Sequence, residues 1–291
     1  NYFNVYGFGI LINPQGGVPC GNNIYRDNYI EGHYGLPGIA LWPWNTEVNN
    51  ETFIRNIIAK TDGTQFAYGH GINLRTIGTA SLKNIKIINN VINNAIKSGI
   101  YVESGANVNN VVAKNNIIVN NGEYGIYGNV FSSYNDVWGN SLGNYGGGAS
   151  LGEGDISADP LFADPENGDF HLKSEYGRWN GTAWVYDNET SPCIDAGDPS
   201  EKDLDGTRIN MGAYGGTSEA SKSPSAAIGT LTGKVMEKGS GTPIAGATIT
   251  ANSYQTTTNS SGDYILNLPV GNYTVIASKE GYQTQYKYNI S

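Results

Sequence analysis

The chain has 291 residues, a formal net charge of −9, 40 glycines and only 15% charged residues. So much glycine disfavours a helical bundle, because glycine is a poor helix former and common in turns, while 38% hydrophobic residues suffice for a buried core. An acidic chain without a basic stripe excludes nucleic acid as a partner, and no apolar run is long enough to predict a membrane span.

Two markers recur along residues 1–142 with a shared period. Gly-Ile pairs start at Gly9, Gly38, Gly71, Gly99 and Gly125, with spacings of 29, 33, 28 and 26 residues. A set of asparagines keeps step, each followed two residues later by Ile or Leu: Asn28, Asn56, Asn90, Asn116 and Asn140. The period is too short for a strand–helix–strand unit and predicts three short strands per repeat, stacked as a solenoid. We therefore expect these asparagines to form one column of amide-to-amide hydrogen bonds.

The asparagine period and the segments Lys83–Asn94 (KNIKIINNVINN) and Asn109–Asn121 (NNVVAKNNIIVNN) resemble right-handed parallel β-helix proteins. The resemblance covers about residues 1–142 and implies an all-β fold of five coils. Strand alternation predicts that the Ile of each Gly-Ile pair, and the residue two positions later, points inward. The positions between and after them then point outward: Leu11/Asn13, Ala40/Trp42, Asn73/Arg75, Tyr101/Glu103 and Tyr127/Asn129.

The repeat stops, on this interpretation, at the glycine-rich loop 143–155, and residues 156–216 are aperiodic. Residues 143–216 carry four basic and fourteen acidic residues. Short phrases in this segment resemble the part that closes β-helices in bacterial and archaeal surface proteins: Asp159–Phe162, Asp169–Leu172, Ser191–Gly197 and Met211–Tyr214. We expect residues 143–216 to act as a cap over the last coil.

Residues 217–227 are small and polar and predict a linker. Beyond them, six short strands are expected at 231–237, 247–251, 256–258, 264–268, 273–278 and 284–290. The phrases Asn259–Tyr264 and Leu268–Thr274 resemble the carboxypeptidase-regulatory-like domain, an Ig/prealbumin-like β-sandwich, over about 228–291. That resemblance implies a non-catalytic role as spacer, stabiliser or surface attachment.

Side chains from the outward positions of neighbouring coils predict a mixed aromatic and polar patch. Its members are Trp42, Asn73, Arg75, Tyr101, Glu103 and Tyr127. Rings stack on the C–H faces of sugars while polar groups bond hydroxyls, so the patch is a candidate contact for a polysaccharide or cell-surface glycan. The alternative is a plain surface sheet with an Arg75–Glu103 ion pair.

An enzymatic interpretation, a polysaccharide lyase or glycoside hydrolase, follows from the β-helix resemblance. Such lyases hold Ca²⁺ with clustered carboxylates beside a basic residue, and glycosidases need two facing carboxylates. No two acids share an outward column here, so no catalytic residue is assigned; His70 and Glu103 are the weak candidates.

Four aspartates within eleven residues, Asp195, Asp198, Asp203 and Asp205, resemble half of a calcium loop. The full twelve-residue spacing and the closing Glu are missing, so a solvated turn is the alternative. The two cysteines, Cys20 and Cys193, lie far apart, permit one disulfide and make no metal spacing.

Together these features favour an extracellular or cell-surface β-solenoid with a structural, adhesive or carbohydrate-contacting role. We also expect copies of the chain to associate head-to-tail into a filament, because exposed edges of stacked ladders recruit further strands. The alternative is a β-helix chain whose N-terminal coils lie outside this sequence.

Overall fold

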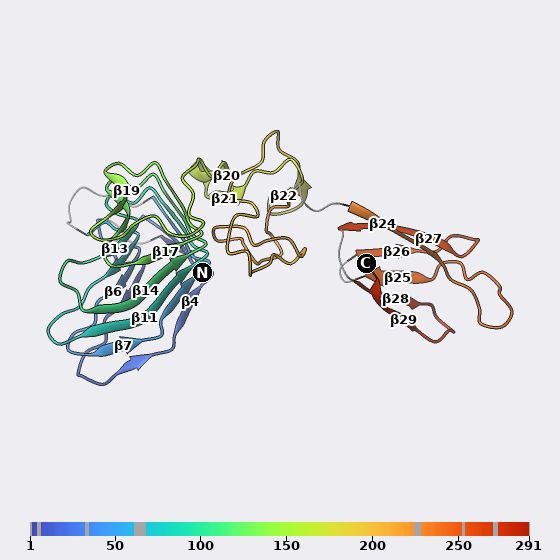
Figure 1. Ribbon diagram of the computed structural model, residues 1–291, viewed down its shortest axis with the longest axis horizontal. Coiled ribbons are helices and arrows are strands. Elements are labelled where there is room, and N and C mark those ends of the chain that lie inside the picture. The colour runs from blue at the N-terminus through green and yellow to red at the C-terminus, as the bar shows by residue number, and fades with distance from the viewer. Residues whose placement is uncertain are drawn as a thin grey trace. The chain divides into compact units, whose positions relative to one another are not determined.

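The computed structural model describes residues 2–4, 7–32, 35–60, 68–223, 228–251, 254–269 and 273–290. The chain forms two compact units, residues 1–223 and 224–291 (Figure 1). Each unit is described by itself below.

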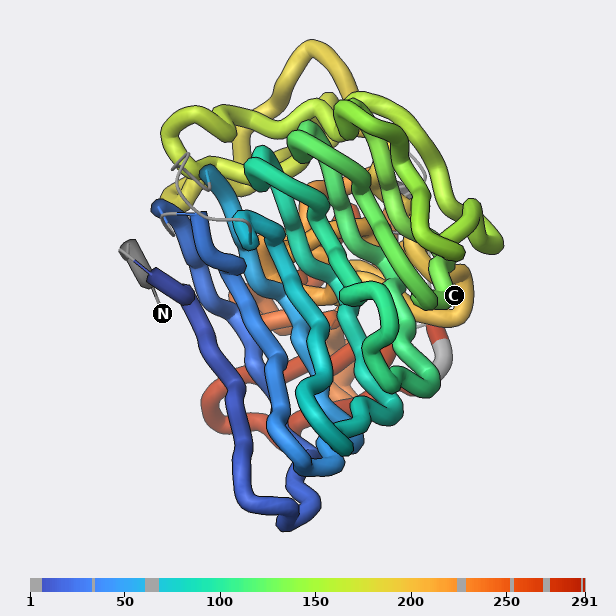
Figure 2. Tube along the Cα trace, turned by 90° about the vertical axis from the view of Figure 1, so that its left-hand side faces the viewer, coloured from blue at the N-terminus to red at the C-terminus, as the bar shows by residue number. Residues whose placement is uncertain are grey.

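The first unit winds through parallel sheets, so that each turn of the chain lies on the previous one (Figure 2). Within the described residues, the first sheet contains β1 (Tyr2–Asn4), β5 (Tyr29–Glu31), β9 (Ile57–Ala59), β12 (Val91–Asn93), β15 (Ile117–Val119) and β18 (Asp136–Trp138). The second contains β2 (Ile10–Ile12), β6 (Ile39–Leu41), β10 (Ile72–Leu74), β13 (Ile100–Val102), β16 (Tyr124–Tyr127) and β19 (Gly143–Gly146). The third contains β3 (Cys20–Gly21), β4 (Ile24–Arg26), β7 (Glu47–Asn49), β8 (Thr52–Ile54), β11 (Ser81–Ile88), β14 (Val108–Lys114) and β17 (Phe131–Ser133).

The interior is a column of aliphatic side chains, as strand alternation predicts. From the second sheet, Ile39, Ile72, Ile100 and Ile126 stand in register and are all fully buried. The first sheet contributes a matching buried row: Ile30, Ile58, Ile92, Ile118 and Val137. Branched side chains suit this position, because they pack on the pleated inner surface of each strand.

A ladder of asparagines runs through the turn between the third and first sheets. The Nδ2 of Asn28 donates to Oδ1 of Asn56 at 2.8 Å, Asn56 to Asn90 at 3.0 Å, and Asn90 to Asn116 at 2.9 Å. The residue before each ladder position has φ between 50° and 56°, the left-handed conformation that makes the sharp turn: Asp27, Arg55, Asn89 and Asn115. The predicted column is therefore confirmed for its first four members.

The fifth predicted member, Asn140, is wrong. Asn116 donates to Asn135 at 2.8 Å, and Asn140 belongs to a second ladder in which it accepts from Asn121 at 2.8 Å. The last full turn is only 19 residues long in both ladders, shorter than the 24 residues assumed from the sequence. The side chain of Leu142, expected inside, is accordingly 62% exposed, and Val137 takes its place in the core.

The repeat does not stop at the glycine-rich segment 143–155. Strand β19 pairs with β16, and single bridges join Glu153 to Ser133 and Ile156 to Asp136. Residues 143–156 thus form one more, abbreviated turn. Tyr145 and Ala149 of this turn pack against the interior of the coil before it.

The segment after this turn covers the side of the solenoid, where a cap over the last coil was expected. It contains β20 (Phe162–Asp164), the 3-10 turn η1 (Pro165–Asn167), β21 (Asp169–Leu172), β22 (Arg178–Trp179) and β23 (Trp184–Val185). Its buried Phe170, Leu172 and Met211 pack on the outer face of the first sheet, against Val91 and Ile117. The outward rows of β9, β12 and β15 are apolar because this segment covers them.

Two left-handed asparagines anchor the segment to the coils. Asn89 Nδ2 donates to the backbone oxygen of Asn210 at 3.1 Å, and Asn115 Nδ2 donates to Glu201 at 2.9 Å. Lys114 pairs with Asp198 at 3.0 Å and also with Glu201. The closing segment and the coils consequently form one unit.

The predicted linker, 217–227, begins too early. Residues 217–223 pack in the first unit, where Ser221 and Ser223 are buried. Ser221 Oγ donates to the oxygen of Leu172 at 2.6 Å, and Ser174 Oγ donates to the oxygen of Lys222 at 2.6 Å. Small polar residues can form such buried side-chain-to-backbone bonds, which composition alone does not distinguish from a linker. Residues 224–227 lie outside the described part.

The second unit has the antiparallel strands predicted from the sequence, with bounds shifted by a few residues. Strand β24 (Ile228–Lys234) pairs with β27 (Asp263–Pro269). A second sheet has the order β26 (Tyr254–Thr257), β25 (Thr248–Ala251), β28 (Tyr273–Ser278) and β29 (Gln285–Ile290). Ile249, Ala251, Leu266, Leu268 and Val275 form the small core between the sheets.

Candidate functional site

The candidate patch is built on the outer side of the second sheet. Asn73 of β10 lies in register with Ala40 of β6 and with Tyr101 of β13, and Tyr101 lies in register with Tyr127 of β16. The next outward positions hold Trp42, Arg75 and Glu103, each just after its strand. Stacking of the coils therefore brings together residues that are about 30 positions apart in the chain.

Trp42 is the centre of an aromatic cluster with one cation. Its ring meets the ring of Phe8 edge-on at 5.0 Å and that of Tyr68 at 5.5 Å. The guanidinium carbon of Arg75 lies 5.6 Å from the Trp42 ring and 5.9 Å from the Tyr68 ring. Arg75 Nε also pairs with Glu103 at 2.9 Å, so the cation is held between rings and a carboxylate.

A second run of rings continues along the coils. His70 stacks on Tyr101 at 4.1 Å, Tyr101 on Tyr127 at 5.1 Å, and Tyr124 lies 5.3 Å from Tyr127. Burial, followed by the neighbouring Tyr127, raises the pKa of Tyr101. Tyr101 and Tyr127 are half-buried and keep part of their surface exposed.

Asn73 does not belong to the exposed surface as expected. Its side chain is 2% exposed and accepts a hydrogen bond from the indole N–H of Trp42. Asn73 therefore orients the indole, and the exposed part of the patch consists of Trp42, Arg75, Tyr101, Glu103 and Tyr127.

The sequence reasoning missed Phe8, Tyr68 and Tyr124. Phe8 and Tyr124 occupy the position just before a Gly-Ile pair, where His70 also lies. That position precedes the strand and joins the patch from its side. The recurring aromatic before Gly-Ile was a signal available in the sequence; Tyr68, in the loop that enters β10, gave none.

The weak catalytic candidates both have structural partners. His70 is buried, its Nδ1 accepts from the backbone N–H of Ser98 at 3.2 Å, and burial, aided by Lys97, lowers its pKa to about 3. Glu103 pairs with Arg75, and Glu123 of the next coil pairs with Lys97 at 2.8 Å. Among the described residues of this face, the geometry does not set two unpaired carboxylates across from each other, as glycoside hydrolysis would need.

Three family profiles match the chain. Residues 1–142 match the right handed beta helix region, residues 110–197 match a family described as disaggregatase related, and residues 230–291 match the carboxypeptidase regulatory-like domain. No curated protein and no solved structure shows a significant match to the chain. The coils are a right-handed β-helix, and the second unit is a carboxypeptidase regulatory-like domain.

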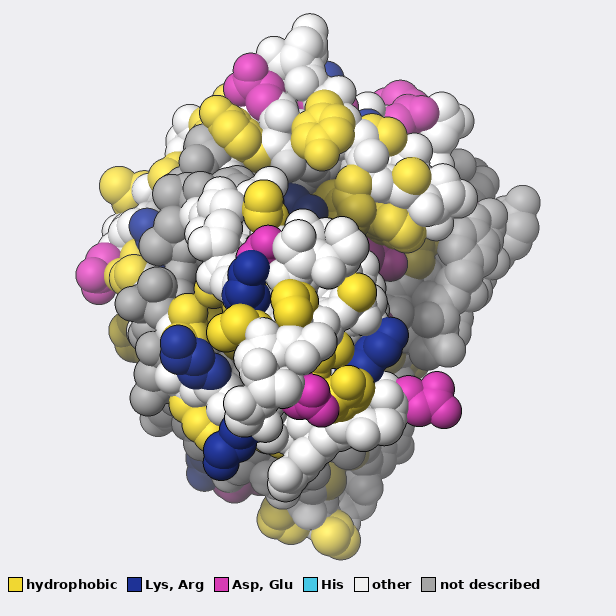
Figure 3. All heavy atoms as spheres, turned by 90° about the vertical axis from the view of Figure 1, so that its right-hand side faces the viewer, with side chains coloured by type: hydrophobic (Ala, Val, Ile, Leu, Met, Phe, Trp, Pro, Cys, Tyr) yellow, Lys and Arg dark blue, Asp and Glu magenta, His cyan; other side chains and the backbone are white. Residues whose placement is uncertain are grey.

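The disaggregatase-related match spans the last turns of the β-helix and most of the side-covering segment. Among the described residues, no helix combines the length and apolar character of a membrane span. One face of the molecule shows Lys, Arg, Asp and Glu side chains interspersed over its described part, without a basic stripe (Figure 3).

The four aspartates proposed as calcium ligands do not converge in the β-helix's covering segment. Asp198 pairs with Lys114 and accepts from Ser200, while Asp205 accepts from the N–H and hydroxyl of Thr207. Asp203 accepts from two backbone N–H groups, and burial raises its pKa to about 7. In the described part of the chain, no group of three or more His, Cys, Asp or Glu side chains has an arrangement that fits a metal ion. A calcium site at Asp195, Asp198, Asp203 and Asp205 stays a prediction without geometric support.

Both cysteines are free thiols. Cys20 is exposed in β3, whereas Cys193 is fully buried and donates to Oδ2 of Asp136 at 3.2 Å. Burial, followed by the charge of Asp136, raises the pKa of Cys193, and burial raises the pKa of Asp136 to about 6. The permitted disulfide is not formed, because the two residues serve different surroundings.

Proposed function

We propose that this β-solenoid works outside the cell or at its surface, and that the outer side of its second sheet contacts a saccharide chain. The observation that carries the proposal is the group of Trp42, Tyr68 and Phe8 around the Arg75 guanidinium. Such a group offers ring faces for sugar C–H groups beside a donor for hydroxyls. The coils carry the rings at fixed spacing, which suits a ligand that is itself a repeating polymer.

The family matches support the location rather than the ligand. A β-helix with a disaggregatase-related segment is suited to work on an exterior, where aggregates form, and the regulatory-like domain suits a spacer or attachment role. An adhesive or structural role follows if the saccharide is bound without being cleaved.

Affinity electrophoresis through gels containing soluble polysaccharides tests the proposal. The double variant Trp42→Ala/Tyr101→Ala removes the largest exposed rings and is expected to lower affinity at least about tenfold, since each ring contact contributes roughly 1 kcal/mol. Phe131→Ala is the matched control, because Phe131 is 62% exposed but belongs to the third sheet. Retention equal to that of the control, in a folded double variant, contradicts a saccharide contact at this patch.

We also propose that the protein self-associates. In the described residues, β24 pairs only with β27 and β29 only with β28, so the second unit offers strand edges, and Tyr286 and Tyr288 lie exposed on β29. Edges of this kind accept a further strand. Sedimentation of the whole chain over a range of concentrations should show concentration-dependent species that Lys287→Pro removes; a monomer at all concentrations refutes the idea.

A further inference from the structure

The hairpin formed by β22 and β23 carries an aromatic face that the candidate patch does not include. In its register Trp179 lies opposite Trp184 and Arg178 opposite Val185. The two indoles meet at 5.7 Å and 62°. Alternation places Tyr186, which is 74% exposed, on the same face as Trp184.

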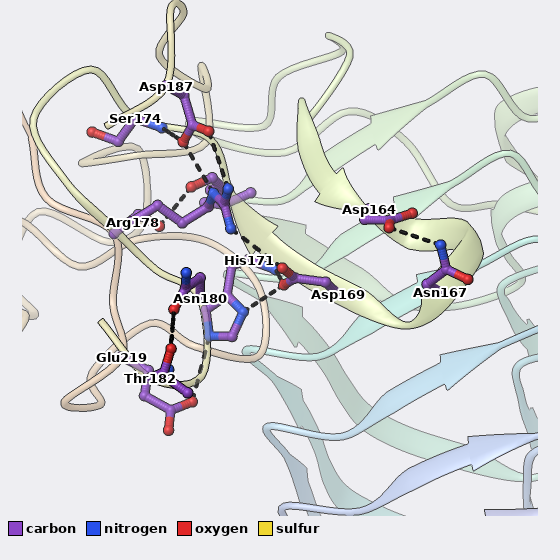
Figure 4. Close-up of polar contacts among 12 residues, drawn as sticks. Asp164, Asn167, Asp169, His171, Ser174, Arg178, Asn180, Thr182, Asp187 and Glu219 are labelled. Atoms are coloured by element: carbon purple, nitrogen blue, oxygen red, sulfur yellow. Dashed lines mark hydrogen bonds and ion pairs between the residues drawn. The ribbon is translucent and has the colours of Figure 1, made fainter. Parts of the chain in front are cut away.

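The opposite face ties the hairpin to the body of the segment (Figure 4). Arg178 bonds Asp187 through Nε at 3.0 Å and Nη2 at 3.1 Å, and reaches Asp169 through Nη1 at 3.3 Å. The backbone N–H of Ser174 donates to Asp187 at 2.9 Å. Two-residue strands need such support, because a short isolated hairpin is barely stable in water.

The tip of the hairpin is also ordered. Asn180 Oδ1 accepts from the N–H of Thr182 at 3.1 Å, its hydroxyl at 3.0 Å and the N–H of Ala183 at 2.9 Å (Figure 4). The rings are therefore held at fixed positions while a large part of Tyr186 faces solvent. Rigid, exposed aromatic side chains lose little conformational entropy when a ligand binds.

Lys222 completes the aromatic face. Its backbone N–H donates to Gly177 at 2.9 Å, its stem lies where a side chain on Gly177 would be, and its Nζ lies 4.1 Å from the centre of a Trp184 ring. Within the described residues, no ion pair joins Lys222 to a carboxylate. Its ammonium is therefore a hydrogen-bond donor at the edge of the rings.

We infer that the face made by Trp179, Trp184, Tyr186 and Lys222 is a second contact surface for saccharide, of the uncharged class. Ring faces match the C–H sides of a pyranose, and the ammonium and phenol match its hydroxyls. Residues 169–190 carry four carboxylates, Asp169, Glu175, Asp187 and Glu189, against Lys173 and Arg178. This negative surrounding disfavours a polyanion and leaves an uncharged chain as the occupant.

The inference rests on the proposed function only in that the protein meets saccharide, since the hairpin and the β-helix patch use different elements. Two surfaces on one chain make the binding of a long polymer bivalent. Apparent affinity for the polymer then exceeds that of either surface alone.

The test uses the whole chain, with a soluble neutral glucan and polygalacturonate as probes. Tyr186→Ala is expected to weaken binding to the glucan about three- to tenfold without changing the fold, and Trp184→Ala/Tyr186→Ala to weaken it further. Tyr282→Ala, 48% exposed in the second unit, is the control and should bind as the parent does. Circular dichroism and thermal unfolding show that each variant is folded.

The variants separate this inference from the proposed function. Loss of glucan binding in Tyr186→Ala, with retention in Trp42→Ala/Tyr101→Ala, supports the hairpin surface and contradicts the patch. The reverse pattern overturns the hairpin surface and leaves the patch standing. Tighter binding of polygalacturonate than of the glucan, lost in Lys222→Gln, overturns the assignment of an uncharged ligand.

Discussion

Asn90→Ala is expected to destabilise the β-helix severely, because Asn90 is a fully buried middle rung of the asparagine ladder. Its Oδ1 accepts from the backbone N–H and the Nδ2 of Asn56, at 2.9 and 3.0 Å. Its Nδ2 lies within bonding distance of the oxygens of Phe53, Ile88 and Asn116, at 2.9, 3.0 and 2.9 Å.

Alanine at position 90 leaves at least two donors of Asn56 without an acceptor inside the protein. A buried polar group without its partner costs about 1–3 kcal/mol, so the loss should be about 3–6 kcal/mol in the free energy of unfolding. Asn90→Asp should be at least as damaging, because a carboxylate cannot donate to the oxygens that the amide serves.

Urea unfolding, followed by tryptophan fluorescence, measures these losses. Asn129→Ala is the control: Asn129 is exposed near the same solenoid, and its replacement should change stability by less than about 0.5 kcal/mol. If Asn90→Ala unfolds within about 1 kcal/mol of that control, the ladder does not hold the coils together and the reasoning fails.

Stability should fall as pH rises from 5 to 8, because burial raises the pKa of Asp136 to about 6 and that of Asp203 to about 7, against about 4 in the unfolded chain. The folded state therefore holds these protons more tightly, and the melting temperature should be higher at pH 5 than at pH 8 by about 5 °C or more; Asp203→Asn should flatten this slope, and an unchanged slope would contradict the assignment. Asp198, whose pKa is lowered to about 2 mainly by its bonds from Ser200, acts in the opposite direction only below pH 4. In thiol labelling, exposed Cys20 should react in the native protein and buried Cys193 only after unfolding; equal rates would place Cys193 outside the core.

The sequence was sufficient for the coils, because their interior and their turns repeat. An Ile after each glycine and an asparagine at each sharp turn are demanded by packing and by the left-handed residue before them. The assignment failed at Asn140 because two asparagine ladders run five residues apart, as at Asn116 and Asn121, and the shortened last turn moved one ladder into the expected place of the other.

The candidate patch was predicted in its main members but not in its depth. Register alone brings Arg75 to Glu103 and Tyr101 to Tyr127, so these contacts followed from the period. The burial of Asn73 beneath the indole of Trp42 depends on side-chain orientation, which a period does not determine. The hairpin aromatics lie in an aperiodic segment, and only the structure relates Lys222 to Trp184.

The asparagine ladder has a direction. Every side-chain N–H points towards the next coil, from Asn28 to Asn135, so the amide dipoles add along the solenoid axis with their positive ends towards later coils. At that end the ladder meets a carboxylate: Asn135 donates to Asp155 through its backbone N–H at 2.7 Å and its Nδ2 at 3.1 Å. An aspartate at the start of an α-helix does the same for aligned peptide dipoles. The β-helix has therefore built, from side chains alone, an electrostatic axis with an anionic terminus at Asp155.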